Sequence, residues 1–256
     1  MKVRQKRCRT KTAVAMKLIK KAGIIILNLF YPPRCPLCEK ILSRGEGRVC
    51  RECRKDLPYI EEPLCKKCGK PLRRQEQEYC LDCETQHHEF LQGRAVFLYE
   101  KKLRHSVHRM KFQNHREYLD FYGEEMAGAG RKYLQQWNIK TILPVPAHKR
   151  KKRERGFDQS FLLAKKIGCI LNIPVEGRAL VRSRYTLPQK ILDARERRNN
   201  LRGAFVLRED IFIQEPVLLV DDIYTTGATM DAICRELKKH GIFRIYFLVL
   251  CAGKGK

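Results

Sequence analysis

The chain has 256 residues, 43% of them hydrophobic, which is enough to bury one full core and leaves room for a second small module. Its 54 lysines and arginines against 28 aspartates and glutamates give a formal net charge of +26, more than solubility needs, and this predicts attraction to polyanions such as nucleic acid, nucleotides or anionic lipid headgroups. The longest apolar run, AGIIILNLF at 22–30, is about half as long as a membrane-spanning helix, so no transmembrane span is expected.

Residues 1–30 have a basic head and an apolar middle, a combination that mimics a secretory signal peptide. Asn28 interrupts the apolar run, and YPPRC follows it where a small-residue cleavage site would stand. These two features favour an uncleaved amphipathic helix over a cleaved leader. Attachment of this helix to the inner face of a membrane is the alternative.

Residues 31–88 hold eight of the twelve cysteines, arranged as four C-x-x-C pairs that start at positions 35, 50, 65 and 80. Each pair places two thiolates on one side of a tight turn, and two such turns complete the tetrahedral sulfur shell that zinc prefers. A disulfide framework and a thioredoxin-like redox motif are the alternatives. The regular spacing and the lack of a convincing secretion signal favour two structural Zn²⁺ ions, held by Cys35, Cys38, Cys50, Cys53, Cys65, Cys68, Cys80 and Cys83.

The spacing leaves open which pairs share an ion, because neighbouring pairs and an interleaved cross-brace both fit. Neighbours, first with second and third with fourth, are favoured because the residues between pairs suffice for a short β-hairpin. The stretch CKKCGKPL also has the Gly and Pro of a zinc-ribbon knuckle. Since eight thiolates already fill two sites, His87 and His88, which follow the last pair, are expected to be linker residues.

Residues 89–256 alternate apolar runs with helical patterns. The runs AVFLY, TILPVP, AFVL, PVLLVDD and IYFLVLC predict strands, while QSFLLAKKIGCILN and TMDAICRELKKHG have helical spacing. Strands that alternate with helices imply an α/β fold with a mostly parallel sheet flanked by helices. In such sheets ligands bind beyond the carboxyl ends of the strands, which directs attention to VLLVDDIYTTGATM at 217–230.

This stretch predicts a buried strand that ends at Asp221 and Asp222, followed by a polar loop that leads into a helix. The loop offers backbone N–H groups, threonine hydroxyls and a glycine near the positive end of a helix dipole, and these features suit a phosphate. The two carboxylates accept hydrogen bonds from vicinal hydroxyls or act through a metal ion. A ribose 5-phosphate unit carries both groups. The alternative is a solvated strand end followed by an ordinary helix cap.

The same stretch resembles the PRPP-binding signature of type I phosphoribosyltransferases. The resemblance implies a type I phosphoribosyltransferase fold for residues 89–256 and PRPP bound together with Mg²⁺. It assigns Asp221 and Asp222 to the ribose hydroxyls. It assigns Thr225, Thr226, Gly227, Ala228 and Thr229 to the 5-phosphate.

The wider pattern resembles the ComF/ComFC family. The motifs YPPRCPLC, RMKFQNHREYLDFYGEEMA, PVPAHKRKKRERGFDQSFLLA and RYTLPQKILDARERRNNLRGAF occur in that family's order, together with the cysteine pairs and the acidic signature. The resemblance implies a cytoplasmic protein of natural competence that handles single-stranded DNA with competence-machinery partners such as a helicase or recombination factors. The resemblance covers essentially everything from about residue 18 onward. Composition divides the chain into three parts: a basic segment at 1–30, a double zinc ribbon at 31–88 and a phosphoribosyltransferase-like domain at 89–256.

The resemblance names further candidate contacts. Ala147, His148 and Lys149 match a loop that receives pyrophosphate, and Arg155, Gly156 and Gln159 match the family pattern RGFNQ, with Asp158 where asparagine is more usual. Gln189, Arg197 and Asn200 lie in a segment that resembles a mobile cover of the site. Lys111 and Phe112 are family positions whose role the sequence leaves undefined. The basic run KRKKRER at 149–155 is otherwise expected to be a solvated loop.

Three functions remain open at this point. The first is an enzyme that transfers a phosphoribosyl group from PRPP to an unknown acceptor, although no general base is evident. The second is a binding protein of DNA uptake that uses the fold to sense PRPP while its basic surface follows the phosphodiester backbone. The third is a PRPP-dependent phosphoribosyltransferase of nucleotide metabolism with no DNA role.

Overall fold

The computed structural model describes residues 31–43, 45–183, 201 and 203–254. The expected N-terminal amphipathic helix and the candidate contacts Gln189, Arg197 and Asn200 lie outside these residues. The chain divides into two compact units, residues 1–55 and residues 56–256. The expected three-part division at residues 30 and 88 stays a prediction.

The smaller unit holds the first two cysteine pairs. A backbone turn forms around Cys35, whose N–H donates to the Lys40 carbonyl at 2.9 Å, and an antiparallel bridge joins Arg34 to Ile41. Helix α2 (Arg51–Lys55) follows and carries Cys53 on its buried side. This is the knuckle expected for a zinc ribbon.

The larger unit is built on a four-stranded sheet with the order β1-β6-β5-β2. Its strands are β1 (Gln92–Leu98), β2 (Thr141–Pro144), β5 (Val217–Tyr224) and β6 (Ile245–Ala252), and every neighbouring pair is parallel. Strands buried on both faces need apolar side chains on both sides, which explains the nearly continuous apolar runs. The predicted parallel α/β sheet is confirmed.

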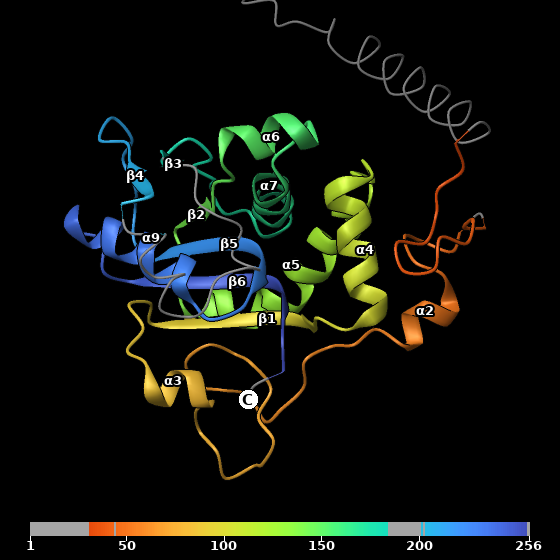
Figure 1. Ribbon diagram of the computed structural model, residues 1–256, viewed down its shortest axis with the longest axis horizontal. Coiled ribbons are helices and arrows are strands. Elements are labelled where there is room, and N and C mark those ends of the chain that lie inside the picture. The colour runs from red at the N-terminus through yellow and green to blue at the C-terminus, as the bar shows by residue number, and fades with distance from the viewer. Residues whose placement is uncertain (1–30, 44, 184–200, 202, 255–256) are drawn as a thin grey trace, which may run out of the picture. The chain divides into compact units, whose positions relative to one another are not determined.

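Helices cover both faces of this sheet, and the alternation of β6 shows how. Leu248 lies against Gly130 of α5 (Tyr118–Gln136), while Phe247 and Val249 point the other way into a core that includes α9 (Ala228–Lys239). Helix α5 packs on α7 (Gln159–Leu171), which in turn packs on β2 and β5. In Figure 1, α6 (Lys149–Arg155) and α7 lie above the strands and α3 (Leu81–Thr85) lies below them.

A helix and a two-stranded antiparallel sheet complete the larger unit. Helix α4 (Lys101–Phe112) follows β1, as its basic helical pattern predicts. Strands β3 (Leu180–Arg182) and β4 (Phe205–Leu207) pair antiparallel on either side of residues 184–200. None of the helices that the structure describes is long and apolar enough to cross a bilayer.

Candidate functional site

The predicted pair of carboxylates lies near the carboxyl end of β5, and Asp222 is its buried member. Asp222 is 5% exposed, and its Oδ2 lies 2.5 Å from Nζ of Lys111, which comes from the last turn of α4. The side-chain amide of Gln159, the first residue of α7, donates to the same oxygen at 3.4 Å. Three elements far apart in the sequence therefore meet at one carboxylate.

Asp221 faces a different set of donors. Its Oδ1 accepts from the hydroxyl of Ser160 at 2.8 Å and from the backbone N–H of Asp222 at 2.9 Å. Burial, followed by the negative charge of Asp222, raises the pKa of Asp221 to about 7. A carboxyl group that ionises near neutral pH, beside a second one that is held by a lysine, is a common feature of ligand sites.

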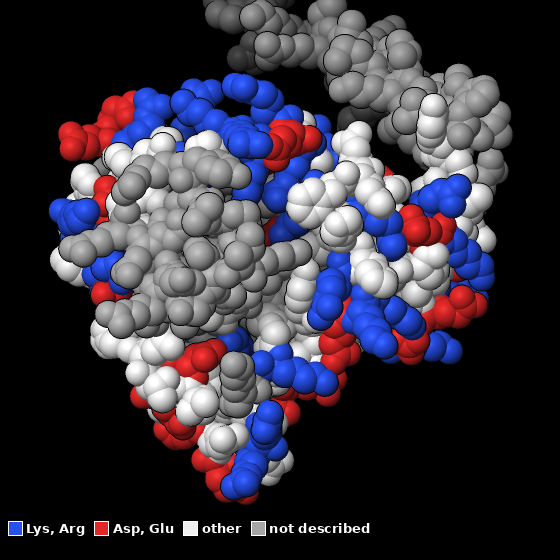
Figure 2. All heavy atoms as spheres, in the orientation of Figure 1, with Lys and Arg blue, Asp and Glu red and all other residues white. Residues whose placement is uncertain are grey.

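Cations gather around these two carboxylates in excess. Burial, and then the positive charges of Arg182, Arg155 and Lys111, lower the pKa of Lys151, while Asp222 acts in the opposite direction. Lys151 therefore stands among three other cations close to a single carboxylate partner. In Figure 2 the Lys and Arg side chains gather along the upper edge of the view, where α6 lies. Such a concentration of positive charge favours a polyanionic ligand.

The basic run at 149–155 is a helix, which corrects the expectation of a solvated loop. His148 caps α6 by accepting the N–H of Arg150 on Nδ1 at 3.2 Å, and Gly156 ends the helix with a left-handed φ of 76°. Asp158 then caps α7 through the N–H of Phe161 at 3.3 Å and pairs with Lys152 at 2.6 Å. Ala147, His148 and Lys149 come just after β2, whose carboxyl end lies beside β5. Their contact with a diphosphate stays a prediction.

The phosphate loop, by which we mean residues 225–229, runs from the end of β5 into the first two residues of α9. Gly227 is the residue before the helix and has a left-handed φ of 81°, which a residue with a side chain rarely adopts. The loop thus leads into the positive end of a helix dipole, as the sequence predicts. Contact of Thr225, Thr226, Ala228 and Thr229 with a phosphate stays a prediction.

The eight cysteines form two four-thiol clusters of neighbouring pairs, which is the favoured arrangement. Cluster 1 consists of Cys35, Cys38, Cys50 and Cys53, and cluster 2 of Cys65, Cys68, Cys80 and Cys83. Within each cluster all sulfur atoms lie within 4.8 Å of one another. The Cys38 and Cys50 sulfurs are 3.7 Å apart and those of Cys68 and Cys80 are 3.6 Å apart. Four thiolates at about 2.3 Å from a tetrahedral zinc ion are about 3.8 Å apart, so the clusters fit two structural zinc ions.

Several residues of this site were not identified from the sequence. Ser160 and Lys151 carried no separate signal, because a serine in a helix and a lysine in a basic run are ordinary. The role of Lys111 was undefined until its ion pair with Asp222 was seen. His88 was expected in a linker, yet it is 3% exposed and its Nδ1 donates to Asp231 at 2.9 Å. Its partner is 143 residues away, beyond the reach of local sequence reasoning.

Comparisons with known proteins agree with the two halves of this architecture. Residues 26–84 match the double zinc ribbon domain family, and residues 162–256 match the phosphoribosyl transferase domain family. A solved adenine phosphoribosyl transferase from Trypanosoma brucei covers 50% of the chain and 64% of its own length, at 16% identity and a TM-score of 0.31, an overlap too weak to support an inference.

Three curated proteins are similar in sequence. "Competence protein F" of Haemophilus influenzae is 36% identical over 41% of this chain and 47% of its own length. "DNA utilization protein YhgH" of Escherichia coli O157:H7 is 36% identical over 43% of this chain and 48% of its own length. "Competence protein ComFC" of Bacillus subtilis is 27% identical over 59% of both chains. The chain thus spans about half the length of the first two relatives it matches.

The family matches join a double zinc ribbon to a phosphoribosyl transferase domain, and the named relatives are competence protein F, YhgH and ComFC. The order of the parts, the two cysteine clusters and the parallel sheet with its acidic pair are those that the sequence resemblance implied. The chain is thus similar in sequence to proteins of the ComF/ComFC family, as its motifs indicated.

Proposed function

We propose that this protein binds PRPP at the carboxyl end of β5 and takes part in the handling of incoming DNA. The observation that carries the proposal is the meeting of Asp221, Asp222 and Lys111 under a group of cations from α6 and β3. PRPP presents the complementary groups, because it has vicinal hydroxyls, a 5-phosphate and a diphosphate on one sugar.

Each part of the site has a partner in this ligand. The carboxylates accept hydrogen bonds from the ribose hydroxyls, and the phosphate loop donates backbone N–H groups to the 5-phosphate. Lys151, Arg155 and Arg182 face the diphosphate. Lys111 forms an ion pair with Asp222 and also belongs to the group of cations around Lys151. It is therefore positioned between the ribose hydroxyls and the diphosphate of the ligand.

Mg²⁺ fits the same donor set, since carboxylate and phosphate oxygens are the ligands that this ion prefers. When bound it supplies further positive charge to the diphosphate oxygens. The residues of the chain supply the rest: Lys151, Arg155 and Arg182 stabilise the charge that grows on pyrophosphate as its bond to C1 of the ribose breaks. A screen of nucleophilic acceptors with PRPP and Mg²⁺ identifies the group that bonds to C1 of the ribose as pyrophosphate leaves.

The decisive experiment is calorimetric titration of Mg²⁺ and PRPP into the zinc-loaded protein and into the variant Asp221→Asn/Asp222→Asn. We expect micromolar to millimolar binding by the wild type and at least tenfold weaker binding by the variant. Asp210→Asn is the matched control, because Asp210 is a surface carboxylate paired with Arg208. Equal affinity of all three proteins would refute the site, and no binding by the wild type would refute the ligand.

A role with DNA is favoured by a separate observation at the edge of the site. Phe112 is 61% exposed at the end of α4, and the guanidinium of Arg155 lies over its ring at 5.2 Å. An exposed aromatic ring next to cations is suited to stacking on a nucleobase while the cations contact phosphates. The names of the relatives, which refer to competence and DNA utilization, point the same way.

Single-stranded DNA binding tests this role. We expect a steep decrease of affinity with salt and a weaker salt dependence in the variant Lys149→Gln/Arg150→Gln/Arg153→Gln, because counterion release scales with the number of phosphate contacts. Phe112→Ala should weaken binding by about fivefold to a hundredfold if the ring stacks on a base. Binding that is indifferent to salt and to both variants, with PRPP binding intact, would favour a role in nucleotide metabolism without DNA.

A further inference from the structure

The phosphate loop rests on two buried side chains at its inner side. A Cβ placed on Gly227 would lie 2.8 Å from the hydroxyl of Tyr224 and 2.8 Å from Cε1 of His88. Those distances are too short for a real side chain, so the backbone of the loop is in direct contact with both rings. Because packed interiors transmit displacement, a shift of either ring moves the loop.

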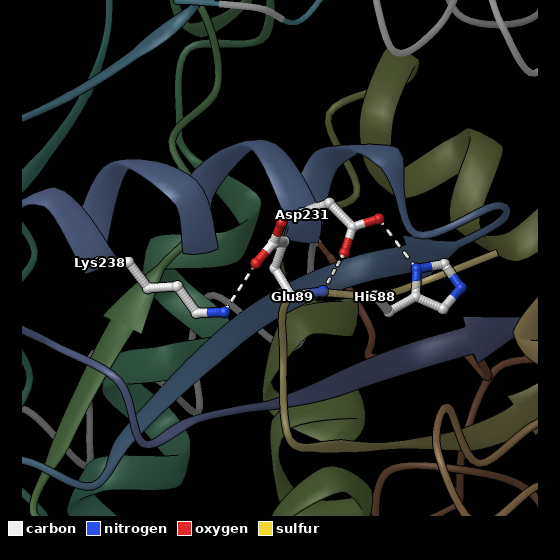
Figure 3. A network of polar contacts seen from close by, with 4 residues as sticks. All are labelled: His88, Glu89, Asp231 and Lys238. Carbon is white, nitrogen blue, oxygen red and sulfur yellow. Dashed lines mark hydrogen bonds and ion pairs between the residues drawn. The ribbon is translucent and has the colours of Figure 1, made fainter.

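His88 and Glu89 are fixed to the first turn of α9, each by one oxygen of the same carboxylate. As Figure 3 shows, Asp231 accepts from Nδ1 of His88 on Oδ2 at 2.9 Å and from the backbone N–H of Glu89 on Oδ1 at 2.9 Å. The backbone N–H of Asp231 in turn donates to the carbonyl of Gly227 at 2.9 Å. The segment at 88–89 and the phosphate loop are therefore held to the same helical turn.

Tyr224 connects the loop to cluster 2. Nζ of Lys70 lies 5.4 Å from the centre of the Tyr224 ring and pairs with Asp82 at 2.7 Å. Lys70 follows the pair Cys65/Cys68, and Asp82 lies between Cys80 and Cys83, so this ion pair joins the two halves of cluster 2 directly beneath the ring. Lys70 is 5% exposed, which makes the pair an interior feature.

The cluster also shares its apolar surroundings with the loop. Cys65, Cys68 and Cys80 belong to the same buried core as Tyr224 and Ala228. Within that core the ring of Phe90 stacks on His88 with centroids 4.9 Å apart and meets the ring of Tyr224 edge-on at 6.3 Å. Cluster 2, the two supporting rings and the start of α9 thus form one continuous packed region.

We propose that zinc in cluster 2 sets the conformation of the phosphate loop through Tyr224 and His88, and that His88 and Asp231 are positioning residues for the anion that the loop binds. Without the metal, four thiols at the base of this region are no longer cross-linked, so the ion pair of Lys70 and the rings above it lose their fixed support. The proposal rests on the proposed function only for the identity of the anion. The coupling itself concerns the conformation of the loop.

The first test compares two cysteines at matched positions. Cys53 and Cys83 are the last ligands of clusters 1 and 2, and each lies on a short helix that begins just after the first cysteine of its pair. Hydrogen exchange is measured at the amides of residues 225–229 in Cys53→Ser and Cys83→Ser, together with zinc content. We expect each variant to lose about one zinc ion. Exchange in the loop should become at least tenfold faster in Cys83→Ser and change less than twofold in Cys53→Ser.

Exchange in β6 shows whether Cys83→Ser has simply unfolded, because that strand is buried throughout its central part. If β6 also loses protection from hydrogen exchange, variants that leave cluster 2 intact provide the test. Asp231→Ala removes both acceptors of His88 and Glu89, while Asp231→Asn keeps one carbonyl oxygen as an acceptor. Lys238→Met is the matched control, because Lys238 joins the far end of the same helix to Glu89 at 2.7 Å.

We expect Asp231→Ala to weaken binding of Mg²⁺ and PRPP about tenfold while the protein retains two zinc ions, with Asp231→Asn intermediate and Lys238→Met within twofold of the wild type. Loop exchange should follow the same order. If loop exchange is faster in Asp231→Ala but the wild type binds no PRPP, the coupling is supported and the proposed ligand is refuted. Unchanged loop exchange and unchanged binding in both Asp231 variants would overturn the coupling and leave the proposed function standing.

Discussion

The two cysteine clusters have the same local structure and different surroundings. The N–H of Cys35 donates to Lys40 at 2.9 Å and that of Cys65 donates to Lys70 at 2.8 Å, thirty positions further along the chain. Short antiparallel bridges, from Arg34 to Ile41 and from Leu64 to Pro71, repeat at the same interval. The repeated turn is therefore set by its own short-range sequence, as expected for a unit organised around a metal.

The two ribbons differ in the burial of the ion pair that lies beside each turn. Lys40 and Glu52 lie 3.6 Å apart with side chains 60% and 76% exposed, whereas Lys70 and Asp82 lie 2.7 Å apart with side chains 6% and 24% exposed. The same pair of positions is thus a surface contact in one ribbon and an interior contact in the other. A repeated motif gives the same local fold, while its energetic weight depends on what is packed around it.

The largest expected effect on stability comes from the residue that ends each repeated turn, which is Glu39 in the first ribbon and Gly69 in the second. Glu39 and Gly69 have φ angles of 63° and 71°, but a Cβ on Gly69 would lie 2.6 Å from the carbonyl oxygen of Gly93 in β1. We expect Gly69→Ala to lower the free energy of unfolding of the larger unit by about 3 kcal/mol, since a backbone atom cannot move aside cheaply.

Glu39→Ala is the control for this effect. Glu39 already carries a Cβ at its left-handed angle, so alanine there introduces no new Cβ, and we expect a change of less than about 0.5 kcal/mol. Thermal and urea unfolding measure both variants. A loss of only about 1 kcal/mol in Gly69→Ala would mean that the left-handed angle alone, and not the contact with β1, makes the glycine necessary.

The next effect compares the two ion pairs. Lys70→Met leaves the Asp82 carboxylate without its partner in a mostly buried place, and we expect a loss of about 2 kcal/mol. Lys40→Met removes an exposed pair, for which about 0 to 0.5 kcal/mol is expected. Chemical denaturation at low and high salt separates them, because only the exposed pair is screened. Equal losses would show that burial does not distinguish the two ribbons.

Much of this architecture follows from the sequence, and the failures share one cause. The four C-x-x-C pairs depend on neighbours in the chain, and four of the five apolar runs are strands of the buried parallel sheet; these were predicted correctly. The fifth run, AFVL, is a strand as predicted, but it lies outside that sheet, in β4, which pairs antiparallel with β3. The helix at 149–155 was taken for a loop because six bases in seven residues look solvated, whereas the structure half-buries Lys151 near Asp222. His88 was missed because its environment is assembled by Asp231.

A smaller effect concerns the acidic site of the larger unit. The pKa of Asp221 is raised to about 7, while an unfolded carboxyl ionises near its ordinary value of 3.8. The folded chain therefore holds the proton more tightly between these values and loses stability as the pH rises through that window. At pH 8 we expect the free energy of unfolding of Asp221→Asn to be about 1–2 kcal/mol higher than that of the wild type.

The difference should shrink as the pH falls from about 7 and vanish below about pH 3, where the wild-type carboxyl is protonated in both states. Melting temperatures of both proteins across this range measure it. Asp221→Asn should bind the ligand more weakly than the wild type, because only the ionised carboxylate accepts two hydroxyl donors. A variant that is more stable but binds less tightly would identify Asp221 as a group retained for function. A pH-independent difference would contradict the raised pKa.

The smallest expected effect on stability is that of Tyr224, and it shows whether the second ribbon supports the phosphate loop by packing or by a hydrogen bond. The Tyr224 hydroxyl is buried and has no hydrogen-bond partner among the described residues, while its ring stacks on Phe247 with centroids 4.8 Å apart. If the ring supports the loop by packing alone, Tyr224→Phe keeps that support and should change stability by less than about 1 kcal/mol, with a slight gain favoured because an unsatisfied polar group is removed.

Tyr224→Leu keeps an apolar side chain but loses the flat ring between Lys70 and Gly227, so loop exchange should rise in this variant and not in Tyr224→Phe. Comparison of the two by hydrogen exchange separates packing from hydrogen bonding. An increase in Tyr224→Phe as large as in Tyr224→Leu would mean that the hydroxyl itself holds the loop. The second ribbon would then differ from the first by a specific polar contact as well as by its burial.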